Sequence, residues 1–134
     1  MNLVLDSSAV IAYLRREDGG IKVNEFITDE NNTCFVHAAN ICEVYYDTVR
    51  TVGSEMAGAT IDALQDAGVI IREDMDLPFW QAAGSYKADL RIISLADCFC
   101  LALANRLDCS LVTSDHHEFD AVVDRGLCRI EFIR

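Results

Sequence analysis

The sequence predicts an α/β domain in which a mostly parallel central sheet lies between two layers of helices. The 134 residues are 51% hydrophobic and 25% charged, with 7 glycines and 1 proline, a composition typical of a folded chain rather than a disordered one. Short apolar runs of strand length alternate with longer segments of helical period. Strands separated by helices favour right-handed crossovers and a parallel sheet covered on both faces. The length predicts one domain, residues 1–134.

The first half of the chain is expected to contain three strands. Apolar residues recur at helical spacing between them, the pair Gly19-Gly20 separates the first two helices, and Gly68 ends the fourth. In order, we expect a strand at 2–5, helices at 8–16 and 21–29, a strand at 34–37, helices beginning at Asn40 and Ser54, and a strand at 69–71.

The second half is expected to add two strands. Asp76 is a helix cap and Pro78 stands where a first turn tolerates proline, so a helix should run from there to about residue 90. Ser94 caps the next helix, to about residue 107. A strand at 110–113, a short helix at 118–124 and a last strand at 128–133 complete the pattern.

The chain is strongly acidic. Eleven Lys and Arg against 22 Asp and Glu give a formal charge of −11, and the pI is near 4.5. This excludes a wide basic face for gripping nucleic acid. It is compatible with a nuclease that draws phosphate in through bound cations, with a chain that docks a basic partner, and with solubility alone.

The six cysteines are too sparse for a disulfide scaffold and contain no Cys-x-x-Cys pair, so we read all six as reduced core thiols. No uncharged apolar run approaches the ~20 residues that span a bilayer. The first residues lack the basic region and long apolar run of a secretory signal. We expect a cytoplasmic protein with no membrane partner.

Four acidic residues stand at positions where chemistry is expected. Asp6 follows the first strand and Asp115 the fourth, and ligands of parallel sheets sit beyond the carboxyl ends of strands. Glu43 and Asp97 each come three residues after a capping residue, Asn40 and Ser94. Each acid also has a structural interpretation: Glu43 and Asp97 fit capping boxes, Asp6 a helix cap, and Asp115 a turn.

Several carboxylates around one cleft repel each other unless a cation neutralises them. Hard oxygen ligands select Mg²⁺ or Mn²⁺, and such an ion suits phosphodiester hydrolysis. Topology alone does not place Asp97 beside Asp6, because its helix follows another helix rather than a strand.

Four short segments carry the four acids in order along the chain. They are Leu3-Val4-Leu5-Asp6-Ser7-Ser8-Ala9, Asn40 to Glu43, Ser94-Leu95-Ala96-Asp97-Cys98, and Val112-Thr113-Ser114-Asp115. Each segment is weak alone, but four in order at fitting spacing are specific. Together they resemble the PIN domain, and in particular the VapC-like ribonuclease toxins of bacterial toxin–antitoxin pairs. The match covers essentially the whole chain, through the closing Phe132-Ile133-Arg134.

The resemblance implies a three-layer PIN-like domain that is an Mg²⁺- or Mn²⁺-dependent endoribonuclease, leaving a 5′-phosphate and a 3′-hydroxyl on RNA. It implies that Asp6 and Asp97 are most directly tied to the metal. Asp115 matches a fourth acid often reached through water, and Glu43 matches a position holding the metal shell or a second cation. Ser7 and Thr113 match supporting hydroxyls. It also implies a homodimer and an antitoxin whose segment crosses the acidic cleft.

The residues after the fourth strand offer further acids. We predict that loss of activity is largest for a change at Asp115, smaller at Glu118, which would be an accessory group, and near neutral at Asp120, which should point elsewhere. Lys87 and Arg91 lie at i,i+4 and could guide RNA phosphate or form a solvated face.

Other side chains favour plainer interpretations. His37 is expected to pack at the end of its strand, His116-His117 to form a solvated turn, and Phe79-Trp80 to contact core or a partner. Arg15 and Arg16 carry the same ambiguity as Lys87.

Two other functions remain open. One is a PIN-like binding module with little or no nuclease activity, and the acidic charge is compatible with this alternative. The other is a different Mg²⁺-dependent phosphoryl-transfer enzyme. A haloacid-dehalogenase pattern would need a second Asp two residues after Asp6, where the chain has Ser8.

Overall fold

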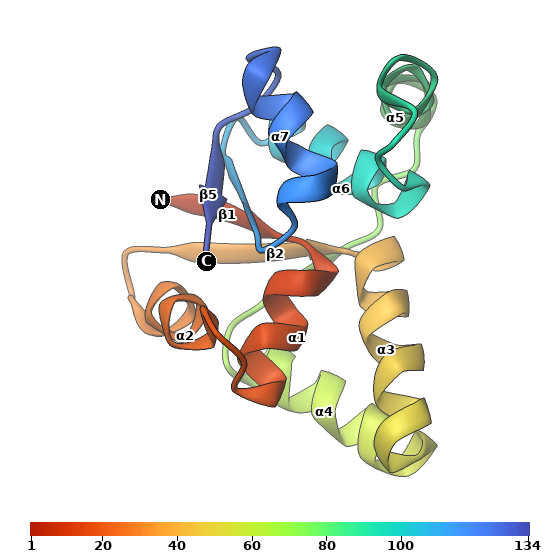
Figure 1. Ribbon diagram of the computed structural model, residues 1–134. Helices are drawn as coiled ribbons and strands as arrows, with labels where there is room; N and C mark the ends of the chain where they lie inside the picture. The colour runs from red at the N-terminus through yellow and green to blue at the C-terminus, as the bar shows by residue number, and fades with distance from the viewer.

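A computed structural model describes all residues, 1–134, and confirms the predicted α/β architecture. One five-stranded sheet lies between a layer formed by α1 to α4 and a layer formed by α5 to α7 (Figure 1). The strands are β1 (Asn2–Leu5), β2 (Thr33–His37), β3 (Ile70–Arg72), β4 (Ser110–Thr113) and β5 (Ile130–Phe132). The helices are α1 (Ser7–Arg15), α2 (Gly20–Thr28), α3 (Ala38–Val52), α4 (Ser54–Asp66), α5 (Leu77–Leu90), α6 (Leu95–Arg106) and α7 (His116–Asp124).

The sheet is parallel throughout, in the order β3-β2-β1-β4-β5. The expectation of a mostly parallel sheet is therefore confirmed in its strictest form. The chain builds outward from β1 to β3 and then returns to the other side of β1 with β4. The switch point of the sheet lies between β1 and β4, which is where parallel sheets place their ligands.

Alternation along the central strands produces two separate cores. Leu3 and Leu5 of β1 pack with α1 to α4, whereas Val4 faces the core formed with α5 to α7. The same division holds in β4, where Val112 and Leu111 point to opposite faces. Because successive strand residues point to opposite faces, a continuous apolar run is required when both faces are buried.

Helix α6 is the most deeply buried helix, because apolar side chains occupy most of its circumference. Cys98 and the whole run from Cys100 to Ala104 are buried. The helix packs against α5 and against β1, β2 and β4. Ser94 caps it as predicted, since its hydroxyl accepts a hydrogen bond from the Asp97 amide at 3.2 Å. The N-terminus of α6 is therefore held beside α3, which contacts it across the sheet edge.

Two predicted helix starts are wrong, and each lies two residues too late. Helix α3 begins at Ala38 rather than Asn40, because the His37 ring accepts a hydrogen bond from the Ala39 amide and serves as the cap. Helix α7 begins at His116 rather than Glu118, because the carboxylate of Asp115 caps it. Asp76 does precede α5, but its carboxylate pairs with Arg106 rather than capping the helix.

The cysteine interpretation is right in most places and wrong in one. All six thiols are free, and Cys34, Cys98, Cys100 and Cys109 are buried. Cys128 is half-buried, and Cys42 is exposed on α3. A cysteine on a helix is buried only if its face of the helix meets the core, and the face of α3 that carries Cys42 does not. None of the helices combines the length and hydropathy that crossing a bilayer requires.

Candidate functional site

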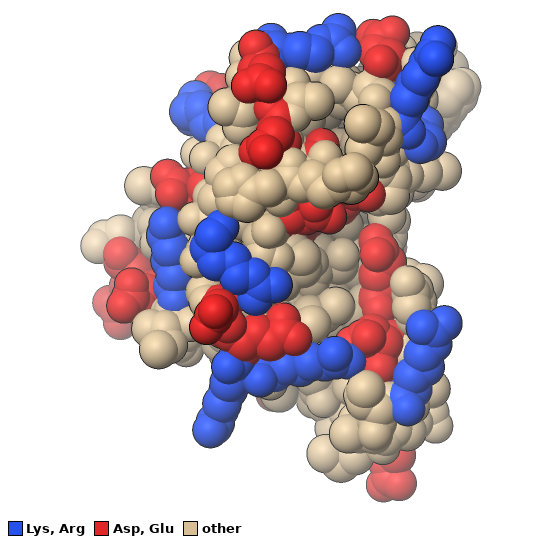
Figure 2. Space-filling model, in the orientation of Figure 1, with Lys and Arg blue, Asp and Glu red and all other residues tan.

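The acidic residues meet at the carboxyl ends of β1 and β4. Leu5 of β1 pairs with Val112 of β4, so the next residues along both strands emerge at the same edge. Figure 2 shows a band of Asp and Glu across the middle of this face, between the two helical layers. The site therefore lies where the parallel topology predicts a ligand.

Asp6 is held by three donors. Thr113 Oγ1 donates to its Oδ2 at 2.6 Å, while Ser8 Oγ and the Ala9 amide donate to its Oδ1 at 2.8 and 2.9 Å. Asp6 thus caps α1, as one of its interpretations proposed, and it is also buried beside β4. Its carboxylate is the most rigidly placed group of the site.

Asp97 lies in the first turn of α6 and is only 6% exposed. Its backbone follows the capping-box pattern, but its carboxylate accepts from Asn40 Nδ2, at 3.3 Å, on a different helix. The residue therefore faces the cleft. The sequence topology does not place Asp97 beside the other acids, and the packing of α6 against α3 does.

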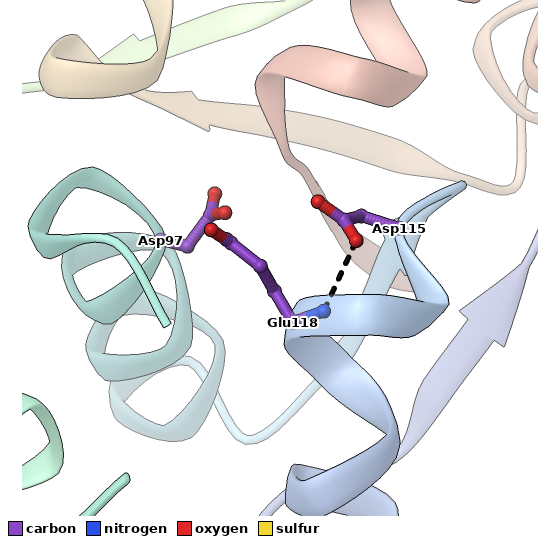
Figure 3. Close-up of side chains that lie close together, drawn as sticks. All are labelled: Asp97, Asp115 and Glu118. Atoms are coloured by element: carbon purple, nitrogen blue, oxygen red, sulfur yellow. Dashed lines mark hydrogen bonds between the residues drawn. The ribbon is translucent and has the colours of Figure 1, made fainter. Parts of the chain in front are cut away.

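Asp97, Asp115 and Glu118 bring one carboxylate oxygen each within 4.8 Å of one another. Figure 3 shows the three side chains converging, Asp97 from α6 and the other two from the start of α7. Asp115 Oδ1 accepts a hydrogen bond from the Glu118 amide at 3.0 Å. The cap therefore fixes Asp115 and Glu118 relative to each other.

Glu43 approaches from α3. Ser7 Oγ lies 3.5 Å from its Oε2, while its Oε1 is buried and has no hydrogen-bond partner. The capping-box interpretation of Asn40 and Glu43 is wrong, because His37 caps this helix and Asn40 is already inside it. Glu43 is therefore free to face the other acids.

The two basic residues predicted to contact RNA lie at the end of α5. The Lys87 ammonium donates hydrogen bonds to the carbonyl oxygens of Arg91 and Ile93, both at 2.8 Å, at the C-terminal end of α5. Arg91 follows that helix as an exposed residue with a positive φ of 59°. Their contact with RNA stays a prediction.

Asp120 and the histidines His116 and His37 make contacts of their own outside the cluster of acids. Asp120 is exposed and lies 3.0 Å from His116 Nδ1. His116 also stacks on Phe132, so His116 contributes to a packed contact rather than a purely solvated turn. The packing role of His37 is confirmed, because its ring stacks against Phe79 and Phe99.

Two polar residues of the site were missed from the sequence. Ser8 donates to Asp6 and accepts from the Ser114 amide at 3.0 Å, which joins α1 to the turn after β4. The sequence predicts only a capping role for Asn40. The Asp6-Ser7-Ser8 run contains a signal for Ser8, but of these two serines the resemblance implies a supporting role for Ser7 alone. Nothing in the sequence pairs Asn40 with Asp97.

Burial changes the acidity of these groups. Loss of solvation raises the pKa of Asp6 to about 6, although its hydrogen bonds oppose the shift. The pKa of Asp97 is raised further, first by burial, then by a hydrogen bond with Glu118 and by the charges of Asp6, Glu118 and Glu43. Burial also raises the pKa of Glu43.

This donor set fits a hard divalent cation. All its side-chain donors are carboxylate oxygens, the chemistry that Mg²⁺ and Mn²⁺ prefer. Glu43 Oε1 and Glu118 Oε2 are buried without a partner, so they are acceptors with no donor from the protein. A cation would satisfy these atoms and offset the mutual repulsion.

The family comparison agrees with this geometry. A family model described as the PIN domain matches residues 3–124. That stretch contains all the acids of the cleft. No curated protein matches the chain significantly by sequence.

Several solved structures share the fold across nearly the whole chain. VapBC2 from Rickettsia felis, solved on a promoter DNA fragment, gives a TM-score of 0.76 at 20% identity and covers 98% of each chain. VapBC-1 from nontypeable Haemophilus influenzae also gives 0.76, at 16% identity, over 99% of this chain and 98% of the other. VapC20 from Mycobacterium tuberculosis, a sarcin–ricin loop cleaving toxin, gives 0.70 at 14% identity, over 90% and 94%. At these identities the likeness concerns the PIN fold.

The raised pKa values of the buried carboxyl groups predict how stability depends on pH without a cation. Folding raises the pKa of Asp6 and Asp97, so the folded state binds more protons than the unfolded state above about pH 4. The free energy of unfolding should therefore fall as pH rises from 5 to 8 in excess chelator. Asp97→Asn should remove most of this fall and raise the melting temperature at pH 8 by about 3 °C or more.

Thermal unfolding at both pH values, with Asp89→Asn as an exposed control, tests this. The pKa of the exposed His116 is raised and its stabilisation also fades over this range, so the variants are compared rather than the slopes alone. Equal pH dependence in Asp97→Asn and the parent protein would show that burial and the neighbouring carboxylates do not raise the pKa of Asp97 as described.

Proposed function

The chain belongs to the PIN domain family, and from that premise we propose that it is a divalent-metal-dependent endoribonuclease, the toxin of a toxin–antitoxin pair. Residues 1–134 act as a single domain in this proposal. One observation carries it: carboxylate oxygens of Asp97, Asp115 and Glu118 lie within 4.8 Å of one another at the switch point of the sheet. The sarcin–ricin loop cleaving toxin with the same fold supports RNA as the substrate class.

Asp6, Asp97 and Asp115 would hold the cation, as the resemblance implies. Glu118 would join them, because its carboxylate lies beside those of Asp97 and Asp115, and Glu43 would add negative charge. Mg²⁺ or Mn²⁺ bound there would supply Lewis acidity for attack of water at phosphorus and positive charge beside the phosphate oxygens. The products would be a 5′-phosphate and a 3′-hydroxyl.

The chain's own contribution is placement. Thr113 donates to Asp6 and accepts from the Asp115 amide, so one hydroxyl sets the distance between these two acids. Ser7 points its hydroxyl at Glu43. Fixed ligands matter because a displacement of about 1 Å can lower a rate ~10²-fold.

The cleft and the phosphates of RNA are both negatively charged. Without a cation, the carboxylates would repel phosphate, so binding of substrate should depend on the metal as well as catalysis. Lys87 and Arg91, at the end of α5, remain the proposed contacts for the RNA backbone. The six free thiols suit a reducing compartment, and we place the protein in the cytoplasm.

We propose an antitoxin as the main protein partner, and a homodimer of this chain. A toxin–antitoxin complex from Klebsiella pneumoniae has the same fold, and so does VapBC2 from Rickettsia felis, which was solved bound to promoter DNA. The net charge of −11 favours a basic segment. A groove between α3 and α4 offers apolar contacts, and it is lined by Ala38, Ile41, Cys42, Tyr45, Gly58, Ile61 and Asp62.

Cleavage of a mixed RNA pool should require Mg²⁺ or Mn²⁺ and stop in excess chelator. Asp6→Asn and Asp97→Asn should each lower the rate ~10²-fold or more, because each removes a charge with little change of volume. Circular dichroism checks that both variants fold. Undiminished cleavage by either folded variant sinks the assignment, and absence of any metal-dependent cleavage would favour a binding module instead.

The three acids after β4 should separate in kinetics. The sequence ranks Asp115 above Glu118, but a carboxylate oxygen of each lies within 4.8 Å of one from Asp97. We expect Asp115→Asn and Glu118→Gln each to raise the metal concentration for half-maximal cleavage about 10-fold or more. The exposed Asp120→Asn is the matched control and should stay within about twofold. If Asp120→Asn raises the metal concentration for half-maximal cleavage more than the other two variants do, the assignment of the cation-binding residues is wrong.

The partner model predicts inhibition. A basic segment with an Arg or Lys reaching the acids, and apolar side chains on the early helices, should abolish cleavage when it is bound. Adding the cognate antitoxin to purified protein in a cleavage assay tests this, with raised salt weakening the inhibition. A neighbour that binds tightly and leaves the rate unchanged contradicts the model.

A further inference from the structure

Asn40 is fully buried in the first turn of α3, between the two helical layers. Buried side-chain amides usually find partners for both ends, since an unpaired polar group in the interior costs stability. Only one end of this amide is paired. Its Oδ1 has no hydrogen-bond partner, whereas its Nδ2 donates to Asp97 Oδ1 at 3.3 Å.

The donor is held firmly in place. His37 caps α3 by accepting from the Ala39 amide at 3.0 Å, and its other ring nitrogen lies 2.9 Å from the Asp74 carbonyl. The ring also stacks against Phe79 and Phe99, with centroids 5.2 Å away in each case. The start of α3, and with it Asn40, is thus fixed against the opposite layer.

Asp97 is consequently anchored from two sides. Ser94 Oγ accepts from its backbone amide on α6, and Asn40 reaches its carboxylate from α3. A neutral donor suits this position. A lysine or arginine there would neutralise the carboxylate and compete with a cation, whereas an amide orients one oxygen and leaves the charge in place.

We propose that Asn40 is a positioning residue of the acidic cleft, which aims the Asp97 carboxylate at the cation site. The proposal rests on the proposed function, because it concerns the same cation. It assigns to Asn40 no contact with RNA and no part in proton transfer.

The test measures binding of Mn²⁺ alone, with no RNA present. Free Mn²⁺ is followed by electron paramagnetic resonance in the parent protein, Asn40→Ala and Asn40→Ser, whose hydroxyl is too short to reach Asp97. Both variants should bind Mn²⁺ about 10-fold more weakly or worse, as for other residues that orient metal ligands. Asn105→Ala, which loses an amide hydrogen bond to Tyr86 away from the cleft, is the control and should be unchanged.

A double-mutant cycle separates positioning from general support of the fold. In the Asp97→Asn background, Asn40→Ala should weaken Mn²⁺ binding no further, because its effect passes through Asp97. An additive loss in that background overturns the proposal, and so does unchanged Mn²⁺ affinity in a folded Asn40 variant. If neither Asn40 variant folds, Asn40 is a structural residue and the proposal is equally wrong. If the parent protein itself binds no Mn²⁺, the proposed function fails with it.

Discussion

The hydrogen bond from Thr113 to Asp6 joins the ends of β1 and β4, and the acidic cleft is arranged around it. It is 2.6 Å long and buried. The same hydroxyl accepts from the Asp115 amide, so a single side chain connects two acids that are more than a hundred residues apart in the chain. This contact exists only because β1 and β4 are parallel neighbours, which brings both carboxyl ends to one edge.

The rest of the fold supports carboxylates that burial destabilises. Asp6 and Asp97 are almost entirely removed from solvent, and desolvation is the main reason that their pKa values rise. The two apolar cores on either face of the sheet supply the opposing free energy. In the proposed function a bound cation would offset this cost, which would link the stability of the site to metal binding.

A second polar cluster joins the connection between β3 and α5 to the end of α6. Arg106, at the end of α6, pairs with Asp74 and Asp76 and lies over the Phe79 ring. Arg72 also pairs with Asp74, whose pKa is lowered to about 2 by these partners. The cluster fixes the connection between β3 and α5, whose Asp74 carbonyl contacts His37. Helices α3 and α6, which carry Glu43 and Asp97, are therefore anchored by contacts outside the cluster of acids.

The sequence by itself determined the alternation of strands and helices, the parallel sheet, and the positions of Asp6 and Asp115 at two strand ends, because these follow from local periodicity and a topological rule. The sequence did not predict where α3 and α7 begin, because a histidine ring and the carboxylate of a residue after a strand cap these helices. Only the tertiary structure placed Asp97, Glu118 and Asn40 together. The helix carrying Asp97 follows another helix, so its position depends on how α6 packs between α3, α5 and the sheet, and no local pattern specifies that packing.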